Sequence, residues 1–289
     1  MRPVALRPAL LVVLLALPVL GGCFQLRTLL RLNADGSGTI EETVALVNEA
    51  RGYLTLGDST GGPLGMYDVD SLRARAADLG PGVTFVRVDT LDEQGYFGYR
   101  AVYHFDDVRR VSYYYNERPI MAPGSEGASG RASSNSFFAG TNENLPVTFD
   151  FAPGRLTVRM PDPPQSGARA AELDPAAVAA AANALRQQFT TSEGAMMRQT
   201  MGSVRLAIAV ELPGTVTRTT AAHAEGTTLT LTDLTFGALF DVIAEKPELF
   251  ARASMLEAQG TPDARPVLRA IAARPGIRYE LRPEVTAEW

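Results

Sequence analysis

Short stretches of the chain alternate between apolar and polar residues, which is the period of a strand with one buried face. Two such stretches, 26–32 and 40–46, flank the sequence Asn-Ala-Asp-Gly-Ser-Gly at 33–38. Asp-Gly between alternating runs is a strong hairpin signal. The pattern therefore predicts that the fold begins with a β-hairpin.

More alternating stretches follow in both halves of the chain. A strand at 83–88 precedes one at 96–105, and a hairpin joins 147–151 to 156–160. In the second half, turns at Pro213-Gly214 and Glu225-Gly226 predict a three-stranded meander. The three strands of this meander are expected at 204–212, 216–222 and 228–234. A last strand is expected at 277–281, and it leads into 285–289.

Helical spacing of apolar residues marks four other stretches. A helix is expected at 70–79, and a longer one starts at Asp174-Pro175, where Asp suits the N-cap and Pro the first turn. This helix is predicted to break near Gly194 and end at Met201. Two more are expected at 236–258, with a restart at Pro247, and at 262–273. Grouped helices and tightly connected strands predict an α+β fold with a mostly antiparallel sheet.

The Pro-rich stretch 161–167 is the best position for a domain boundary. It separates a β-rich region, 23–160, from a helix-containing region, 161–289. We expect the two regions to share one sheet, because the last strand needs a partner. Residues 116–136 have no periodicity and are rich in Gly, Ser and Asn, so they predict a mobile loop.

Residues 1–22 have the layout of a secretion signal. Arg2 and Arg7 give a positive start, and an apolar run from Ala9 to Leu20 follows. A spanning helix needs about 20 apolar residues. This run is shorter and contains a proline, which favours a cleaved signal over a permanent span.

Leu20-Gly21-Gly22-Cys23 matches the bacterial lipoprotein signal at every position, and the chain resembles that family here. The resemblance implies cleavage between Gly22 and Cys23 and a diacylglyceryl group on the Cys23 thiol. The alternative is an ordinary signal followed by an incidental cysteine. Two or more acyl chains anchor a protein stably. Phe24 stands where that family carries an inner-membrane retention Asp, which favours the periplasmic face of an outer membrane in a two-membrane host.

The composition of the chain limits the kinds of partner that it is expected to bind. Cys23 is the single cysteine, so a lipidated chain forms no disulfide. The net charge is −5 and becomes more negative when the two signal arginines are removed. Nucleic acid is therefore excluded as an expected partner, because phosphate binding needs a basic surface. The expected partners are the membrane, through the lipid on Cys23, and a lipid or an envelope protein.

Aromatic residues concentrate around 97–113. Alternation places Phe97, Tyr99, Tyr103 and Phe105 on one strand face, and Tyr113 follows. Aromatic side chains with polar tips can line a ligand cleft, so these five are the candidate ligand-binding residues. The alternative interpretation is that they form the packing face of the sheet.

Candidate catalytic residues do not withstand comparison with known mechanisms. Gly57-Asp58-Ser59-Thr60-Gly61 fits G-x-S-x-G and resembles a serine-protease segment with Thr60 inserted. In that family the histidine precedes the serine, whereas His104 and His223 both follow it. A nucleophile elbow also needs a helix after the serine, which Gly61-Gly62-Pro63 does not favour. No catalytic residue is predicted, and a hydrolase at Ser59 is a remote alternative.

Metal and cofactor sites are not predicted either. The sequence from Asn33 to Ile40 resembles the start of an EF-hand loop, but its twelfth position is Val44 instead of a bidentate Glu. The flanking stretches also alternate as strands. We interpret Asp35 as a turn residue that bonds to its own backbone.

The order of lipoprotein signal, Asp-Gly-Ser-Gly hairpin, helix, paired strands and Glu-Leu-Pro-Gly-Thr-Val resembles the LppM-type lipoprotein domain. The residues that carry the resemblance are Cys23, Asp35–Gly38 and Leu212–Val216. It implies a β-rich, membrane-tethered domain that binds lipid and has no catalytic set. The chain departs from that pattern by its helical stretch at 174–202.

Two functions follow as hypotheses. The first is a non-enzymatic lipoprotein that binds a lipid, a hydrophobic ligand or an envelope protein near the membrane. The second is a structural or assembly subunit of an envelope complex that uses its helices as partner surfaces. An apolar cavity in the sheet would favour the first, and an exposed apolar helix face would favour the second.

Overall fold

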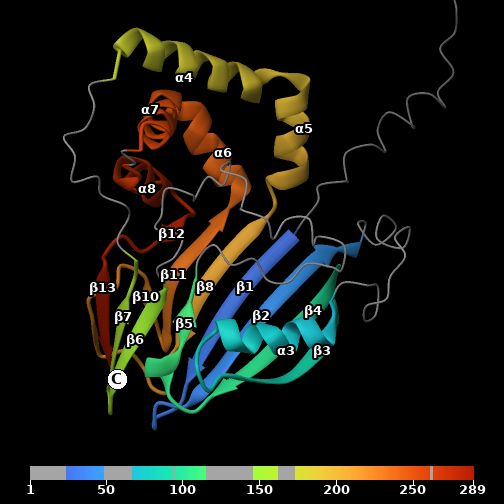
Figure 1. Cartoon of the computed structure of the whole chain (residues 1–289), viewed down its shortest axis with the longest axis vertical. Coiled ribbons are helices and arrows are strands. Elements are labelled where there is room, and N and C mark those ends of the chain that lie inside the picture. Colours follow the sequence, from blue (N-terminus) through green and yellow to red (C-terminus); the bar gives the residue numbers. More distant parts are fainter. Residues whose placement is uncertain (1–23, 49–66, 94, 115–145, 162–172, 261–262) are drawn as a thin grey trace, which may run out of the picture.

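The computed structural model describes residues 24–48, 67–93, 95–114, 146–161, 173–260 and 263–289. Two β-sheets lie face to face, and a layer of helices lies beyond one end of the larger sheet (Figure 1). The predicted mobile loop at 116–136 and Ser59 lie outside the described residues. The α+β class and the mostly antiparallel pairing are confirmed.

The predicted N-terminal hairpin is present. Strand β1 (Phe24–Leu32) pairs antiparallel with β2 (Gly38–Val47). In the turn, the Asn33 amide donates to the Ser37 carbonyl at 2.8 Å, and Gly36 adopts a φ of 88°. Asp35 Oδ1 accepts from the Ser37 amide at 3.0 Å and from its hydroxyl at 2.6 Å. The Asp and Ser side chains thus stabilise a turn, as the sequence predicts.

The larger sheet has the order β10-β11-β8-β1-β2-β4-β3, with β12 paired to β11. Its pairs are antiparallel except β1 and β8, which run parallel from Gln25 beside Arg205. Its other strands are β3 (Thr84–Glu93), β4 (Tyr96–Phe105), β8 (Arg205–Glu211), β10 (Ala224–Glu225), β11 (Thr228–Thr235) and β12 (Arg278–Tyr279).

The second sheet has the order β5-β6-β7-β13-β9. It takes strands from both halves of the chain, as the larger sheet does. A short 3₁₀ helix, η3 (Val108–Arg110), precedes it. Its strands are β5 (Ser112–Tyr113), β6 (Val147–Ala152), β7 (Arg155–Arg159), β9 (Arg218–Thr219) and β13 (Glu284–Glu288).

The predicted meander in the second half is wrong. Both edges of β8 are occupied, by β1 and by β11, so the stretch 216–222 has no edge of β8 to join. It forms the short β9 in the second sheet instead, where Thr219 Oγ1 donates to the Thr286 carbonyl at 2.8 Å. The expected strand at 277–281 shrinks to β12, and the C-terminal residues form the longer β13.

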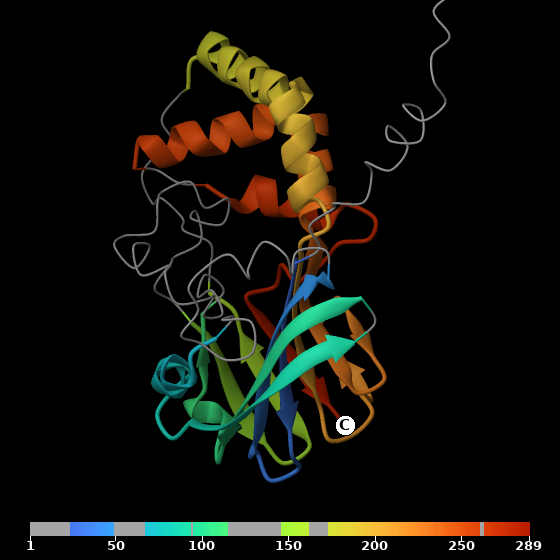
Figure 2. The same cartoon turned by 90° about the vertical axis from the view of Figure 1, so that its right-hand side faces the viewer.

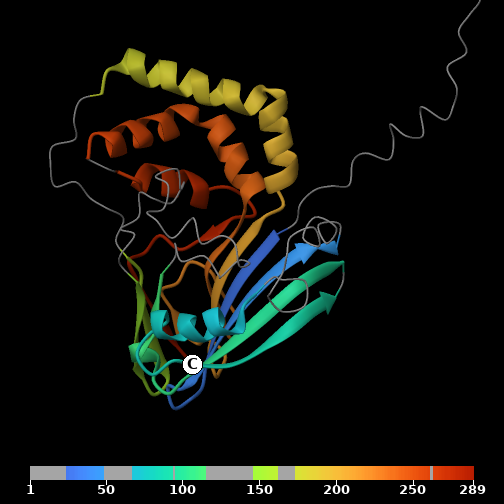
Figure 3. The same cartoon turned by 45° about the vertical axis from the view of Figure 1, so that its right-hand side comes forward.

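Helix α3 (Val69–Asp78) covers part of the larger sheet (Figure 3). Asp68 caps it by accepting from the Ser71 amide at 2.8 Å. Its buried face carries Leu72 and Ala76, which join the core between the sheets. This helix therefore closes the part of the inner face that the second sheet leaves open.

Five further helices form the layer seen at the top of Figure 2. Helix α5 leads into β8, and β11 leads into α6, so this layer is connected directly to the larger sheet. Its own apolar core includes Phe189, Phe240, Ile243, Phe250 and Ile271. The helices are α4 (Pro175–Thr190), α5 (Ser192–Met201), α6 (Phe236–Glu245), α7 (Pro247–Ala258) and α8 (Arg265–Ala272).

Two predicted helix boundaries can be compared with the structure. The restart at Pro247 is confirmed, since Lys246 lies between α6 and α7. The break predicted near Gly194 falls at Thr191, whose hydroxyl accepts from the Gly194 amide at 3.2 Å as the N-cap of α5. The Thr191 side chain caps the new helix. Gly194 allows the close packing at the bend, because a Cβ there would collide with the Gln188 carbonyl oxygen and would lie 2.8 Å from Phe189 Cα.

Candidate functional site

The five aromatic candidates lie in the core between the sheets. Phe97, Tyr99, Tyr103 and Phe105 project from β4 and are each at most 1% exposed. Tyr113 on β5 is 7% exposed, and its hydroxyl lies 2.9 Å from Thr28 Oγ1 on β1. The predicted shared face is thus confirmed, and it faces inward. The ligand-binding role of these residues stays a prediction.

The cavity beside one of these side chains, Tyr113, is small. A cavity of about 10 Å³ lies between the sheets and is lined by residues that include Thr28, Leu30, Tyr113 and Phe149. A single water needs roughly 10–15 Å³ by the same kind of measure. The space beside Tyr113 is therefore too small for a lipid chain.

A buried ion pair lies beside the aromatic residues. Arg75 Nη2 on α3 contacts Glu42 Oε1 on β2 at 3.0 Å, and the two side chains are 4% and 2% exposed. Burial, followed by the charge of Glu42, raises the pKa of Tyr99 and of Tyr103, so both phenols stay neutral. This cluster is built for packing and charge compensation.

The second candidate site is the end of the larger sheet at Phe24, next to the predicted lipidation residue Cys23. Phe24 is the first residue of β1, and Cys23 and Gly22 precede it outside the described residues. Because Gln25 lies beside Arg205, which follows α5 closely, β1 begins at the end of the sheet that carries the helices (Figure 1). Near this end, Met196 and Met201 on α5 are 68% and 39% exposed.

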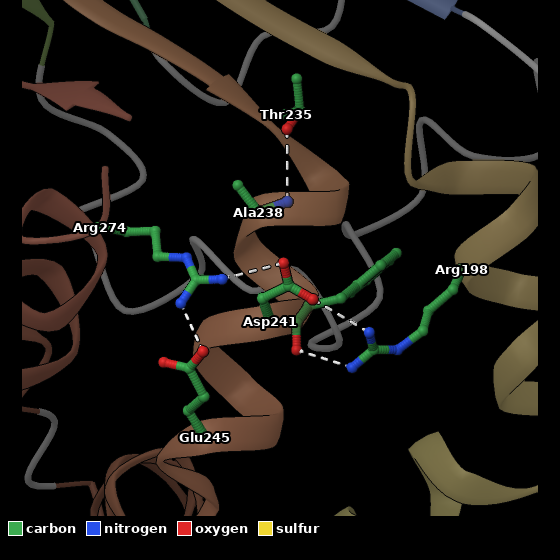
Figure 4. A network of polar contacts seen from close by, with 7 residues as sticks. Arg198, Thr235, Ala238, Asp241, Glu245 and Arg274 are labelled. Atoms are coloured by element: carbon green, nitrogen blue, oxygen red, sulfur yellow. Dashed lines mark hydrogen bonds and ion pairs between the residues drawn. The ribbon is translucent and has the colours of Figure 1, made fainter. Parts of the chain in front are cut away.

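A polar network holds the helices together at this end (Figure 4). Asp241 on α6 accepts from Arg198 Nη1 of α5 through Oδ1 and from Arg274 Nη2 through Oδ2, each at 3.1 Å. Arg274, which follows α8, also pairs with Glu245 of α6. Each charge in the network has an opposite partner, which indicates a structural clamp joining α5, α6 and the end of α8.

A surface groove of about 680 Å³ lies between α4, α7 and α8. No local sequence pattern predicts this groove, because its lining residues come from several helices. The sequence around α8 carries a signal for one side of the groove, because residues that line it recur at helical spacing. They are Pro266, Arg269 and Ala270 in the helix and Ala273 at its C-cap.

The remaining candidates are not brought together. His104 on β4 lies 3.0 Å from Asp106 and is 43% exposed, and His223 precedes β10. Within the described ranges, no group of three or more His, Cys, Asp or Glu residues could hold a metal ion. In the same part of the chain, no helix is long and apolar enough to cross a membrane.

Comparison with solved structures finds a structural neighbour of the chain. No protein-family model matches the chain, and no curated protein matches it. Among solved structures, it is similar to the folded domain of the LppM protein of Mycobacterium tuberculosis, determined by NMR. The identity is 15% and the TM-score is 0.29, with 75% of this chain and 85% of the other covered.

Proposed function

We propose that the chain is a non-enzymatic lipoprotein of the bacterial cell envelope that is held directly on the membrane surface. The observation that supports this proposal most is the position of Phe24, which follows Cys23 and already belongs to β1. One residue of extended chain spans at most about 3.6 Å. A lipid on Cys23 would therefore hold this end of the sheet against the headgroups without a flexible spacer.

The orientation follows from this attachment. Helices α5 and α6 lie at the same end of the larger sheet as Phe24, so they would face the bilayer or molecules on its surface. In a host with two membranes, Phe24 in place of a retention Asp favours the outer membrane. The protein would bind a lipid, another hydrophobic ligand or an envelope protein there.

A second function, an assembly subunit of an envelope complex, is supported by Met196 and Met201. Both side chains are exposed on one helix, and Met is enriched at protein interfaces. Crosslinking of the lipoprotein in its own membrane tests this function. A specific protein product through α5 would support it, and the absence of any product would contradict it.

The attachment is tested on the full chain expressed in a bacterium. We expect the mature protein to begin at Cys23, to carry the mass of a diacylglyceryl group and to leave the membrane only in detergent. The matched control, Cys23→Ser, should show neither that cleavage nor that mass. A wild-type mature protein with an unmodified thiol in the soluble fraction would contradict the proposal.

A further inference from the structure

The groove between α4, α7 and α8 has an apolar base. Val178 from the first turn of α4, Leu249 from α7 and Ala270 from α8 line it, together with Pro266 and Ala273. It is an open depression of the surface with a volume of about 680 Å³. The groove thus offers an apolar surface to part of a ligand.

Positive charge borders this apolar base. Lys246, Arg252 and Arg269 line the groove, and all three are exposed. Among the residues that the structure describes, none of the three has an ion pair. Lys246 is the N-cap of α7, Arg252 lies in the first half of that helix, and Arg269 comes from α8.

The two carboxylates of the groove do not neutralise these cations. Glu245 pairs with Arg274, and Glu248 pairs with Arg186 Nη2 at 3.1 Å. Both carboxylates are therefore compensated by arginines that are not groove-lining residues. In a chain with a net charge of −5, a groove with three uncompensated cations is a local reversal of charge.

We infer that this groove binds one anionic phospholipid. Its phosphate would lie among Lys246, Arg252 and Arg269, and part of an acyl chain would lie along Val178, Leu249 and Ala270. Arg matches phosphate geometry with paired N–H donors, and Lys adds a point charge. The choice of a lipid over a free anion rests on the apolar base and on the proposed function, which holds the helical layer at a membrane.

The test uses the full lipidated protein in vesicles with a photoactivatable phosphatidylglycerol that carries a diazirine on one acyl chain. The same diazirine on phosphatidylcholine is the neutral comparison. Labelled peptides are mapped by mass spectrometry. We expect the phosphatidylglycerol probe to label peptides of Pro247–Ala258 and Arg265–Ala272, and to label them more strongly than the neutral probe does.

The decisive variant is Arg252→Gln/Arg269→Gln. Each cation near an anionic surface contributes about fivefold in affinity, so we expect groove labelling by the anionic probe to fall about tenfold or more. The matched control is Arg27→Gln/Arg100→Gln, which removes two exposed arginines from the larger sheet. It should leave labelling unchanged. All variants should keep the wild-type melting temperature, because none of these arginines forms an ion pair within the described part of the chain.

The experiment separates an error in the groove inference from an error in the proposed lipid anchor. If the protein floats with vesicles but the groove is labelled equally by both probes, or equally in the variant, the groove inference is overturned and the anchor stands. If the protein does not float, the anchor fails. The same labelling in mixed micelles of detergent and lipid, which needs no anchor, then still decides whether the groove binds the anionic lipid.

Discussion

Arg75 on α3 donates to Glu42 on β2 at 3.0 Å inside the core, where the two side chains are 4% and 2% exposed. The guanidinium adds a second, longer bond from Nε to Oε2 at 3.4 Å. The pair joins the helix to the sheet face that carries the buried tyrosines. Two charges at such a depth are tolerated because each compensates the other.

Removal of one partner should therefore be costly. Arg75→Met leaves Glu42 charged and buried, and we expect the free energy of unfolding to fall by about 3–5 kcal/mol. Urea denaturation of the purified protein measures this. The double variant Arg75→Met/Glu42→Leu should recover most of the loss, because no uncompensated charge remains.

The control is Arg73→Met, two residues before Arg75 on the same helix. Arg73 pairs with Asp70, but the two side chains are 62% and 84% exposed. Its removal should cost less than about 0.5 kcal/mol. If Arg73→Met and Arg75→Met lowered the free energy of unfolding equally, the buried pair would contribute no more to stability than the exposed pair.

Gly38 at the start of β2 has a steric role. A Cβ at this position would collide with the Arg31 carbonyl oxygen and would lie 2.6 Å from Phe105 Cζ. We expect Gly38→Ala to destabilise the protein by about 2 kcal/mol or more, because the hairpin must move away from the core. Thermal denaturation by circular dichroism gives the measurement.

Gly226 provides the comparison for that substitution. It has a φ of 60°, and nothing lies within 4 Å of the position of its Cβ. Gly226→Ala should cost only about 1 kcal/mol of left-handed backbone strain. If Gly226→Ala proves the more harmful variant, the close approach at Gly38 does not limit stability.

The Asp68 cap makes stability depend on acid pH. Hydrogen bonds from the side chain and then the backbone of Ser71 hold the pKa of Asp68 below its ordinary value of 3.8. A lowered folded-state pKa stabilises the fold above the ordinary value, and this contribution is lost as the pH falls through the folded-state value. The unfolding midpoint of the wild type should therefore fall as the pH drops below about 4.

The control variant is Asp68→Asn, which keeps a capping oxygen but does not titrate. Its midpoint should fall less steeply than that of the wild type over the same acid range. Parallel pH profiles for the two proteins would assign the acid sensitivity to other carboxylates, such as Asp107, whose pKa is also lowered by a hydrogen bond, from Arg109.

Local patterns in the sequence predict much of the fold. Tyr96–Phe105 is a strand with the expected ends, because its alternation is uninterrupted, and the 33–38 turn is set by Asp35 and Gly36. The path of 216–222 could not be predicted in this way. Its partner β13 lies far along the chain, and pairing to the second sheet depends on which edges β1 and β11 already occupy.

The groove could not be predicted from local patterns in the sequence. Its cations follow from the sequence, but their lack of partners depends on the pairing of Glu245 with Arg274 and of Glu248 with Arg186. The second of these pairs joins residues 62 positions apart. The aromatic stretch shows the opposite case, since its pattern predicts a shared face but not whether that face meets solvent or the second sheet.

The exposed Met196 allows the orientation of the helical layer to be measured. Cys23 is the single natural cysteine, so a lipidated Met196→Cys variant has one free thiol. If α5 faces the membrane surface, a membrane-impermeant maleimide should label this thiol slowly in native membranes and quickly after solubilisation in detergent. The matched control is Val86→Cys on β3, where the natural side chain is 49% exposed.

Val86 lies toward the end of the sheet opposite Phe24, because β3 starts beside the end of β4 that pairs with Gly38. Val86→Cys should therefore react at the same rate before and after solubilisation. Equal rates for Met196→Cys in both states would show that α5 faces away from the membrane and from any partner. Protection that persists in vesicles of pure lipid would indicate contact with the bilayer, whereas protection only in native membranes would indicate a protein bound to α5.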